Sequence, residues 1–191
     1  DYPQVIEAID FLRHVALGDR RAPGRRAVVV GGGNVAIDAA RTCLRLGSEE
    51  VTIAYRRTRA EMPADVEELE QAEDEGIHIA FLTIPTGIRG TDGRLTGLNC
   101  LRAKLVKKDG SDRLFPVPEE GSDFVIETDC VISAIGQRVD PDCLADLSGL
   151  KWSRRQTIQA SAVSMETSVP GVFAGGDAVT GPATVVEAIG A

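Results

Sequence analysis

A glycine-rich turn near the start of the chain has the residue types that can hold a phosphate group. Its spacing is Gly31-x-Gly33-x-x-Ala36, and it directly follows the apolar segment 28–30. Gly31 permits a tight turn, Gly33 lets the backbone approach a diphosphate, and Ala36 lets a helix pack closely on its strand. Backbone N–H groups at the start of that helix could then bind phosphate oxygens. The motif alone is weak evidence, so the elements around it decide its meaning.

These elements form a strand–helix–strand unit. Residues 37–46 have helical periodicity with Ile37, Ala40 and Leu44 on one face, and Gly47 follows as a helix terminator. The next apolar strand, 51–55, comes at once and completes a unit of about 30 residues. The unit favours a dinucleotide site, and the alternative is an ordinary turn in an unrelated α/β protein.

The residues after the second strand indicate which nucleotide is bound. An NAD site usually has an acidic residue there, whereas this strand is followed by Arg56, Arg57 and Arg59. Glu49 and Glu50 precede the strand and so lie at its wrong end. Guanidinium groups make paired, charge-assisted hydrogen bonds to phosphate, which favours NADP(H) with its 2′-phosphate. The alternative is a solvated basic turn that is balanced by the nearby acids Glu61, Asp65 and Glu67.

Composition excludes several classes of protein. The 191 residues are 43% hydrophobic and 26% charged, which is typical of a globular domain with a normal core. A net charge of −8 argues against nucleic-acid binding, and no apolar run is long enough to span a membrane. The four cysteines are widely spaced without a C-x-x-C pair. We therefore expect buried, reduced thiols in a cytoplasmic protein, with no metal site.

The other elements predict an α/β fold, a Rossmann-like three-layer parallel sheet with a β-meander. Before the meander, these elements are an amphipathic helix at 3–17, a linker at 20–26, an acidic helix at 64–75 and a strand at 77–82. The meander extends from 86 to 127 and includes the strand 95–106 and a turn at 108–110. A buried strand follows at 129–135. The loop Ala134-Ile135-Gly136-Gln137 ends that last strand. It either faces the nucleotide or is a routine glycine turn.

A second glycine signal lies near the end of the chain. A strand is expected at 157–160, and an apolar segment at 171–174 leads into Gly175-Gly176-Asp177. A helix of small residues follows from Pro182.

Both signals together resemble a known family. The chain is similar to the NADPH-binding portion of the small (beta) subunit of NADPH-dependent glutamate synthase and related flavoproteins. The matching segments are GGGNVAIDAART at 31–42, VTIAYRRTRAEMPA at 51–64, EEGSDF at 119–124, SAIGQ at 133–137 and TSVPGVFAGGDAVTGPATVVEAIGA at 167–191.

The resemblance implies an oxidoreductase that passes a hydride from NADPH to FAD and then transfers electrons to a large subunit or another redox partner. It assigns to NADPH the residues Gly31, Gly32, Gly33, Asn34, Val35, Arg56, Arg57, Arg59, Ala134, Ile135, Gly136 and Gln137. It assigns to FAD the residues Gly176, Asp177, Thr184 and Val185. The cofactors carry the chemistry, so no side chain is expected to act as a catalytic acid, base or nucleophile.

The chain also departs from that family, since it has a single glycine dinucleotide loop and no cysteine-rich region. We therefore expect a connecting helix and linker at 1–23, an NADP(H)-binding domain at 24–150 and an incomplete part of a FAD-binding domain at 151–191. FAD would be absent or weakly held, and this portion alone would be inactive. The alternative function is an NADP(H)-binding sensor or docking module without turnover.

Overall fold

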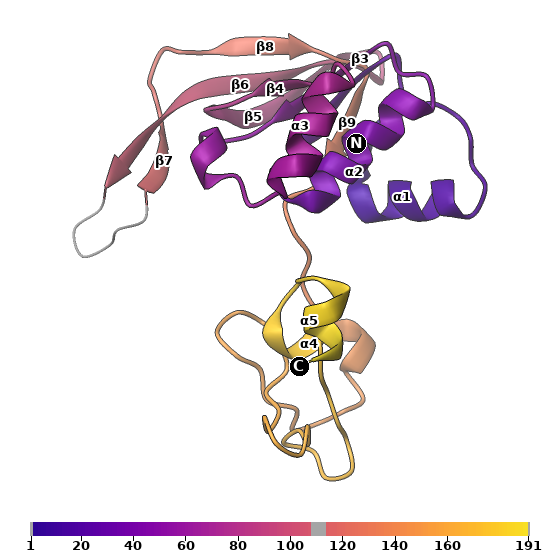
Figure 1. The fold of residues 1–191 in the computed structure, drawn as a ribbon, viewed down its shortest axis with the longest axis vertical. Coiled ribbons are helices and arrows are strands. Elements are labelled where there is room, and N and C mark those ends of the chain that lie inside the picture. Colours follow the sequence, from indigo (N-terminus) through magenta and orange to yellow (C-terminus); the bar gives the residue numbers. More distant parts are fainter. Residues whose placement is uncertain (1, 108–113, 191) are drawn as a thin grey trace. The chain divides into compact units, whose positions relative to one another are not determined.

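The computed structural model describes residues 2–107 and 114–190, and the chain divides into two compact units, 1–135 and 136–191 (Figure 1). The predicted turn at 108–110 lies outside the described residues. Within the described ranges, no helix is long and apolar enough to cross a membrane.

A five-stranded parallel sheet forms the centre of the first unit. Its strand order is β1-β9-β2-β3-β4, and every neighbouring pair is parallel. The bounds are β1 Val5–Glu7, β2 Arg26–Val30, β3 Glu50–Ala54, β4 His78–Ala80 and β9 Cys130–Ser133. The predicted parallel sheet is therefore confirmed. Because the strands are parallel, the carboxyl ends of β2, β3 and β9 lie along the same edge of the sheet.

Helices cover one face of this sheet and a meander covers the other. The helices are α1 Ala8–Ala16, α2 Asn34–Arg45 and α3 Val66–Asp74, and the short helix η1 Arg59–Glu61 precedes α3. Alternation along the strands supplies both cores: Val29 and Ile132 pack in the core on the helix side, whereas Val28 and Val131 pack against the meander. The three-layer prediction is confirmed.

The meander is antiparallel and is built on one long strand. Strand β6 (Arg94–Lys107) pairs with β5 (Thr83–Thr91), β7 (Leu114–Pro118) and β8 (Phe124–Glu127). Figure 1 shows this group beside the parallel sheet, on the side away from α1. Leu95, Leu98 and Cys100 of β6 bury their side chains against the sheet.

The N-terminal segment differs from its predicted structure. The expected helix at 3–17 begins only at Ala8, because residues Val5–Glu7 form strand β1, which pairs with β9 from Val5 and Val131 onward. Sequence periodicity alone could not predict this strand, since its stabilisation comes from hydrogen bonds to a strand more than a hundred residues away.

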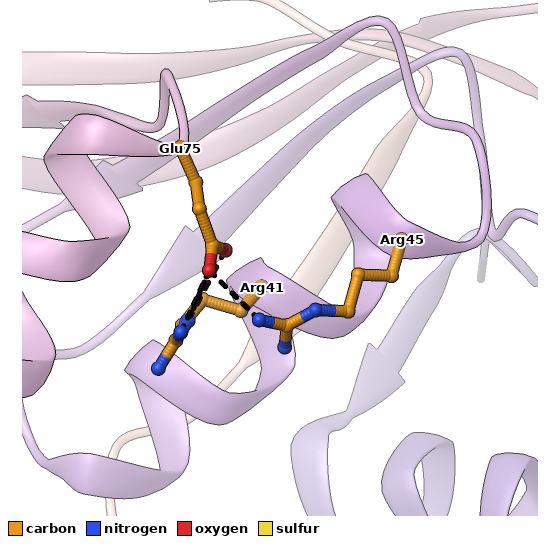
Figure 2. A network of polar contacts seen from close by, with 3 residues as sticks. All are labelled: Arg41, Arg45 and Glu75. Carbon is orange, nitrogen blue, oxygen red and sulfur yellow. Dashed lines mark hydrogen bonds and ion pairs between the residues drawn. The ribbon is translucent and has the colours of Figure 1, made fainter.

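An ion-pair cluster joins α2 to the end of α3 (Figure 2). Nη2 of Arg41 and Nη2 of Arg45 donate to Oε1 of Glu75 at 2.6 and 2.7 Å. Glu75 is the C-terminal cap residue of α3, and the bound guanidinium of Arg41 lowers the pKa of its carboxyl group. The cluster fixes the distal turns of α2, while the glycine loop lies at the opposite end of that helix.

The second unit consists of short elements. These are η2 Asp142–Leu144, α4 Asp177–Thr180 and α5 Val185–Ile189. The strand predicted at 157–160 is present only as isolated bridges, Trp152 with Ile158 and Ala160 with Thr167.

The cysteines divide between buried and exposed positions. Cys43, Cys100 and Cys130 are buried, and burial raises the pKa of the Cys43 and Cys130 thiols to about 12. Cys143 is exposed, so the prediction of buried thiols is wrong for this residue. It lies in the short η2 turn of the second unit, which has little core to cover it.

Candidate functional site

The turn after β2 requires glycine for both conformation and space. Gly31 has a φ of +151°, and a Cβ atom there would lie 2.4 Å from the carbonyl oxygen of Ala134. Its N–H donates to the carbonyl of Ala54 at 3.1 Å. The backbone at Gly31 therefore lies tightly between the ends of β3 and β9.

The next two glycines have opposite surroundings. A Cβ atom on Gly32 would lie 2.4 Å from the ring of Tyr55, whereas a Cβ atom on Gly33 would meet no protein atom within 4 Å. Gly32 is therefore required by packing. Gly33 borders open space, so a side chain there would hinder only a molecule that approaches the loop from solvent.

Helix α2 starts directly behind Gly33 and leaves its first N–H groups available. Gly33 is the N-terminal cap residue, and no side chain caps the helix. The carbonyl of Gly33 accepts from the N–H groups of Ala36 and Ile37, whereas the preceding N–H groups, of Asn34 and Val35, have no acceptor within the helix. Ala36 is fully buried, so α2 packs closely on the sheet as the motif predicts. Such an uncapped helix start attracts an anion.

The segment with the arginines is attached to the glycine loop by hydrogen bonds. The N–H of Ala64 donates to the carbonyl of Gly32 at 3.1 Å, and the N–H of Asp65 donates to Oδ1 of Asn34 at 2.9 Å. Tyr55, which covers Gly32, donates its hydroxyl proton to the carbonyl of Glu61 at 2.6 Å. The predicted phosphate loop and the predicted arginine site therefore lie side by side.

The sequence pattern did not reveal these attachments. Tyr55 and Ala64 were expected only as parts of a strand and a helix. Asn34 was predicted to serve the nucleotide, and the structure uses its side-chain oxygen to hold the backbone of Asp65. A role of Asn34 toward the nucleotide stays a prediction. The one sequence signal for the role of Tyr55 is its position as an aromatic residue at the end of a strand, directly before the basic residues.

The acidic residues near the arginines are mostly engaged elsewhere. Glu61 accepts from the backbone and hydroxyl of Thr58, at 3.2 and 2.5 Å. The carboxylate of Asp65 caps α3 by accepting from the N–H groups of Glu67 and Glu68. Glu61 and Asp65, two of the acids that the solvated-turn alternative requires, therefore bind backbone groups and do not pair with the arginines.

The three arginines differ in their surroundings. Arg59 forms an ion pair with Glu73 of α3. Arg56 is exposed, and among the residues that the structure describes it has no ion pair. Nε of Arg57 is buried and has no hydrogen-bond partner within those residues. A buried guanidinium nitrogen without an acceptor is costly, so an anion at this position would remove that cost.

The loop after β9 begins beside Gly31. The N–H of Ala134 donates to the carbonyl of Val30 at 2.8 Å, and the side chain of Ile135 is 76% exposed. Gly136 has a φ of +105°, and with the exposed Gln137 it begins the second compact unit. Ala134, the first residue of the predicted loop, thus lies against the glycine turn.

The second unit contains a cavity of about 400 Å³. Gln137, Arg138, Arg155 and Asp177 are among the polar and charged residues that line it. Gly176 caps α4 with a φ of +57°, where a Cβ atom would lie 3.1 Å from the carbonyl oxygen of Ala188. The glycine therefore lets the chain turn so that Asp177 meets the cavity.

The remaining predicted site residues lie outside this lining. Thr184 caps α5 and exchanges hydrogen bonds with Glu187, which lower the pKa of the Glu187 carboxyl group. Val185 is 75% exposed. The structure therefore brings Gln137 and Asp177 to one cavity and leaves Thr184 and Val185 apart from it.

The same fold occurs in solved oxidoreductases. Mycobacterium tuberculosis FprA in complex with NADPH aligns with a TM-score of 0.74 over 97% of this chain and 55% of that chain. At 22% sequence identity, this likeness concerns the fold alone.

The sequence comparison defines the family. The family model for pyridine nucleotide-disulphide oxidoreductases matches residues 3–191, and the chain belongs to this family. The NADP(+)-dependent formate dehydrogenase subunit beta of Moorella thermoacetica is 46% identical over 98% of this chain and 26% of that protein. The glutamate synthase [NADPH] small chain of Azospirillum brasilense is 36% identical over 97% of this chain and 41% of that protein. The chain thus spans between a quarter and two fifths of these relatives, and the resemblance to glutamate synthase small subunits is confirmed.

Proposed function

We propose that this chain is the NADPH-binding portion of a flavoprotein oxidoreductase that passes a hydride from NADPH to FAD. The observation that carries the proposal is the uncapped start of α2 in a loop joined to the arginine segment, where Arg56 and Arg57 have no ion pair among the described residues. An anion-binding helix start and a basic group fixed next to it match the diphosphate and the 2′-phosphate of one nucleotide. The names of both relatives include NADP(+) or NADPH, which supports this choice.

At the NADPH end, each group of residues has a separate task. Gly31 and Gly32 let the turn pack closely on Ala134 and Tyr55, and Gly33 keeps a side chain away from the diphosphate. The N–H groups of Asn34 and Val35 donate to the diphosphate. Arg56, Arg57 and Arg59 bind the 2′-phosphate. The open space at Gly33 and the unpartnered Nε of Arg57 support the fit of NADPH to these Rossmann-like loops. The loop from Ala134 to Gln137 would guide the nucleotide toward its redox partner.

At the FAD end, the chain supplies part of a site. Bound FAD would supply a two-electron acceptor for the hydride and release electrons to a further centre. Asp177 would accept a hydrogen bond from a hydroxyl group of FAD, and Gly176 lets the backbone approach. Thr184 and Val185 would line the flavin. The positive φ of Gly176 and the position of Asp177 in the lining of the cavity support this fit.

The domain assignment belongs to the same proposal. Residues 24–150 would form the NADP(H)-binding domain, to which the connecting segment 1–23 adds β1 and α1, although the compact unit itself ends at residue 135. Residues 151–191 would form part of a FAD-binding domain. The electron acceptor would be a large partner subunit or another redox partner. Because one relative is a subunit of a formate dehydrogenase and another is the small chain of a glutamate synthase, we propose no particular acceptor. A cytoplasmic location stays a prediction.

Calorimetric titration of the chain with NADPH and with NADH tests the nucleotide assignment. We expect measurable binding of NADPH and much weaker binding of NADH, and equal affinities would refute the arginine argument. The redox role is tested on the full-length parent protein. Flavin absorbance that bleaches on addition of NADPH supports hydride transfer, whereas a colourless protein that binds NADPH would favour the sensor or docking function.

A further inference from the structure

Arg59 differs from its neighbours because it already has an anionic partner. Nη2 of Arg59 and Oε2 of Glu73 form an ion pair between η1 and α3. Both side chains are partly exposed, Arg59 by 46% and Glu73 by 35%, so an arriving ligand can reach the pair. Arg56 and Arg57 have no such competitor among the described residues.

The backbone around Arg59 is held without Glu73. Thr58 and Glu61 form a capping box that holds the short η1 helix through the hydrogen bonds described above. The carbonyl of Arg57 accepts from the N–H of Leu82 at 3.0 Å, and Ala64 donates to Gly32. The Arg59–Glu73 contact is therefore dispensable for the position of the loop and acts on the direction of one guanidinium.

We infer that Glu73 lowers the affinity for NADPH relative to NADH by competing with the 2′-phosphate for Arg59. The inference rests on the proposed function and adds a residue that lowers affinity for NADPH. A phosphate monoester carries about −2 charge at pH 7, so it can replace a single carboxylate on a guanidinium. Glu73 already occupies Nη2 of Arg59, so the phosphate either displaces this carboxylate or binds beside it, where the charge of Glu73 repels it.

The opposing effect should be modest. Partly exposed ion pairs contribute little to stability, and their strength falls as salt screens them. Removal of the competitor should therefore tighten NADPH binding by about two- to fivefold, with no matching change for NADH. NADH lacks the phosphate, so it gains nothing from a released Arg59.

Glu73→Gln in the full chain tests the inference by calorimetry with NADPH and NADH. Glutamine has nearly the same helix propensity as glutamate, so α3 should remain intact, which a thermal melt verifies. Glu70→Gln is the matched control, because Glu70 is exposed on the same helix and has no ion pair within the described residues. The double variant Arg59→Ala/Glu73→Gln should lose most of the gain.

The outcomes separate the two proposals. Tighter NADPH binding in Glu73→Gln, with unchanged NADH binding and an unchanged control, supports the inference. Unchanged or weaker NADPH binding overturns it, since Glu73 would then be neutral or would hold Arg59 ready for the phosphate. An equal gain in Glu70→Gln also overturns it, because net charge would explain the effect. Wild-type protein that binds neither nucleotide refutes the proposed function itself.

Discussion

Replacement of Gly33 by alanine should weaken nucleotide binding and leave the stability of the fold nearly unchanged. Gly33 has a φ of −92°, which alanine adopts readily, and its Cβ atom would meet no protein atom within 4 Å. The expected cost to stability is only the poorer capping of α2 by alanine, about 0.5–1 kcal/mol. In a chain of this size, that cost lowers the melting temperature by about 2–4 °C at most.

The cost to nucleotide binding should be larger. In the complex, the new methyl group would occupy space that the diphosphate needs, and forcing a methyl into a filled site costs about 1–3 kcal/mol. This corresponds to a loss of about 5- to 150-fold in affinity. NADPH and NADH carry the same diphosphate, so both should lose affinity by the same factor.

Calorimetric titration and a thermal melt of Gly33→Ala check both halves of this expectation. Gly31→Ala is the matched comparison, because its Cβ atom would lie 2.4 Å from the Ala134 carbonyl oxygen at an unfavourable φ. That variant should lose stability as well as binding. If Gly33→Ala binds NADPH as tightly as wild type, the diphosphate does not lie at the start of α2, and the site is wrong.

Other expectations follow from the same contacts. Arg56→Ala and Arg57→Ala should each weaken NADPH binding by about 1.5–3 kcal/mol and hardly affect NADH, and equal losses for both nucleotides would contradict this. Arg41 lowers the pKa of Glu75, so this carboxylate stabilises the fold above its unfolded pKa, and the contribution disappears as pH falls through the lowered value. Glu75→Gln should thus reduce the melting temperature at pH 7, with the gap closing in acid; a constant gap would argue against the ion pair. In native protein a thiol reagent should label Cys143 alone, and rapid labelling of a second thiol would show that the buried thiols open readily.

Local signals made part of this structure predictable. The glycine turn, the helix behind it and the following strand have their periodicity and terminators in adjacent residues, and α2 lies where the pattern indicates. Strand β1 was not predictable in this way, since three residues become a strand only by pairing with β9. The same limit applies to the bridges around Ile158, which depend on contacts within the second unit.

The arginine cluster shows that prediction from sequence has a comparable limit at the candidate site. Basic residues after a strand indicated a phosphate, but the sequence could not tell which of them has a free guanidinium. That division depends on where α3 lies, because Glu73 reaches Arg59 from a helix turn fourteen residues away in sequence. The acids nearest in sequence, Glu61 and Asp65, are occupied by backbone groups instead.

Asn34 connects the two halves of the predicted site. Its side chain and the carbonyl of Gly32 both accept hydrogen bonds from the backbone that follows the arginines. The loop predicted to bind the diphosphate therefore also holds the loop predicted to bind the 2′-phosphate, although they lie on different connections of the sheet. Because changes in one loop would move the other, affinity losses from substitutions in the two loops should not add. Specificity for the 2′-phosphate in this fold would thus depend on glycine-loop geometry as well as on the arginines themselves.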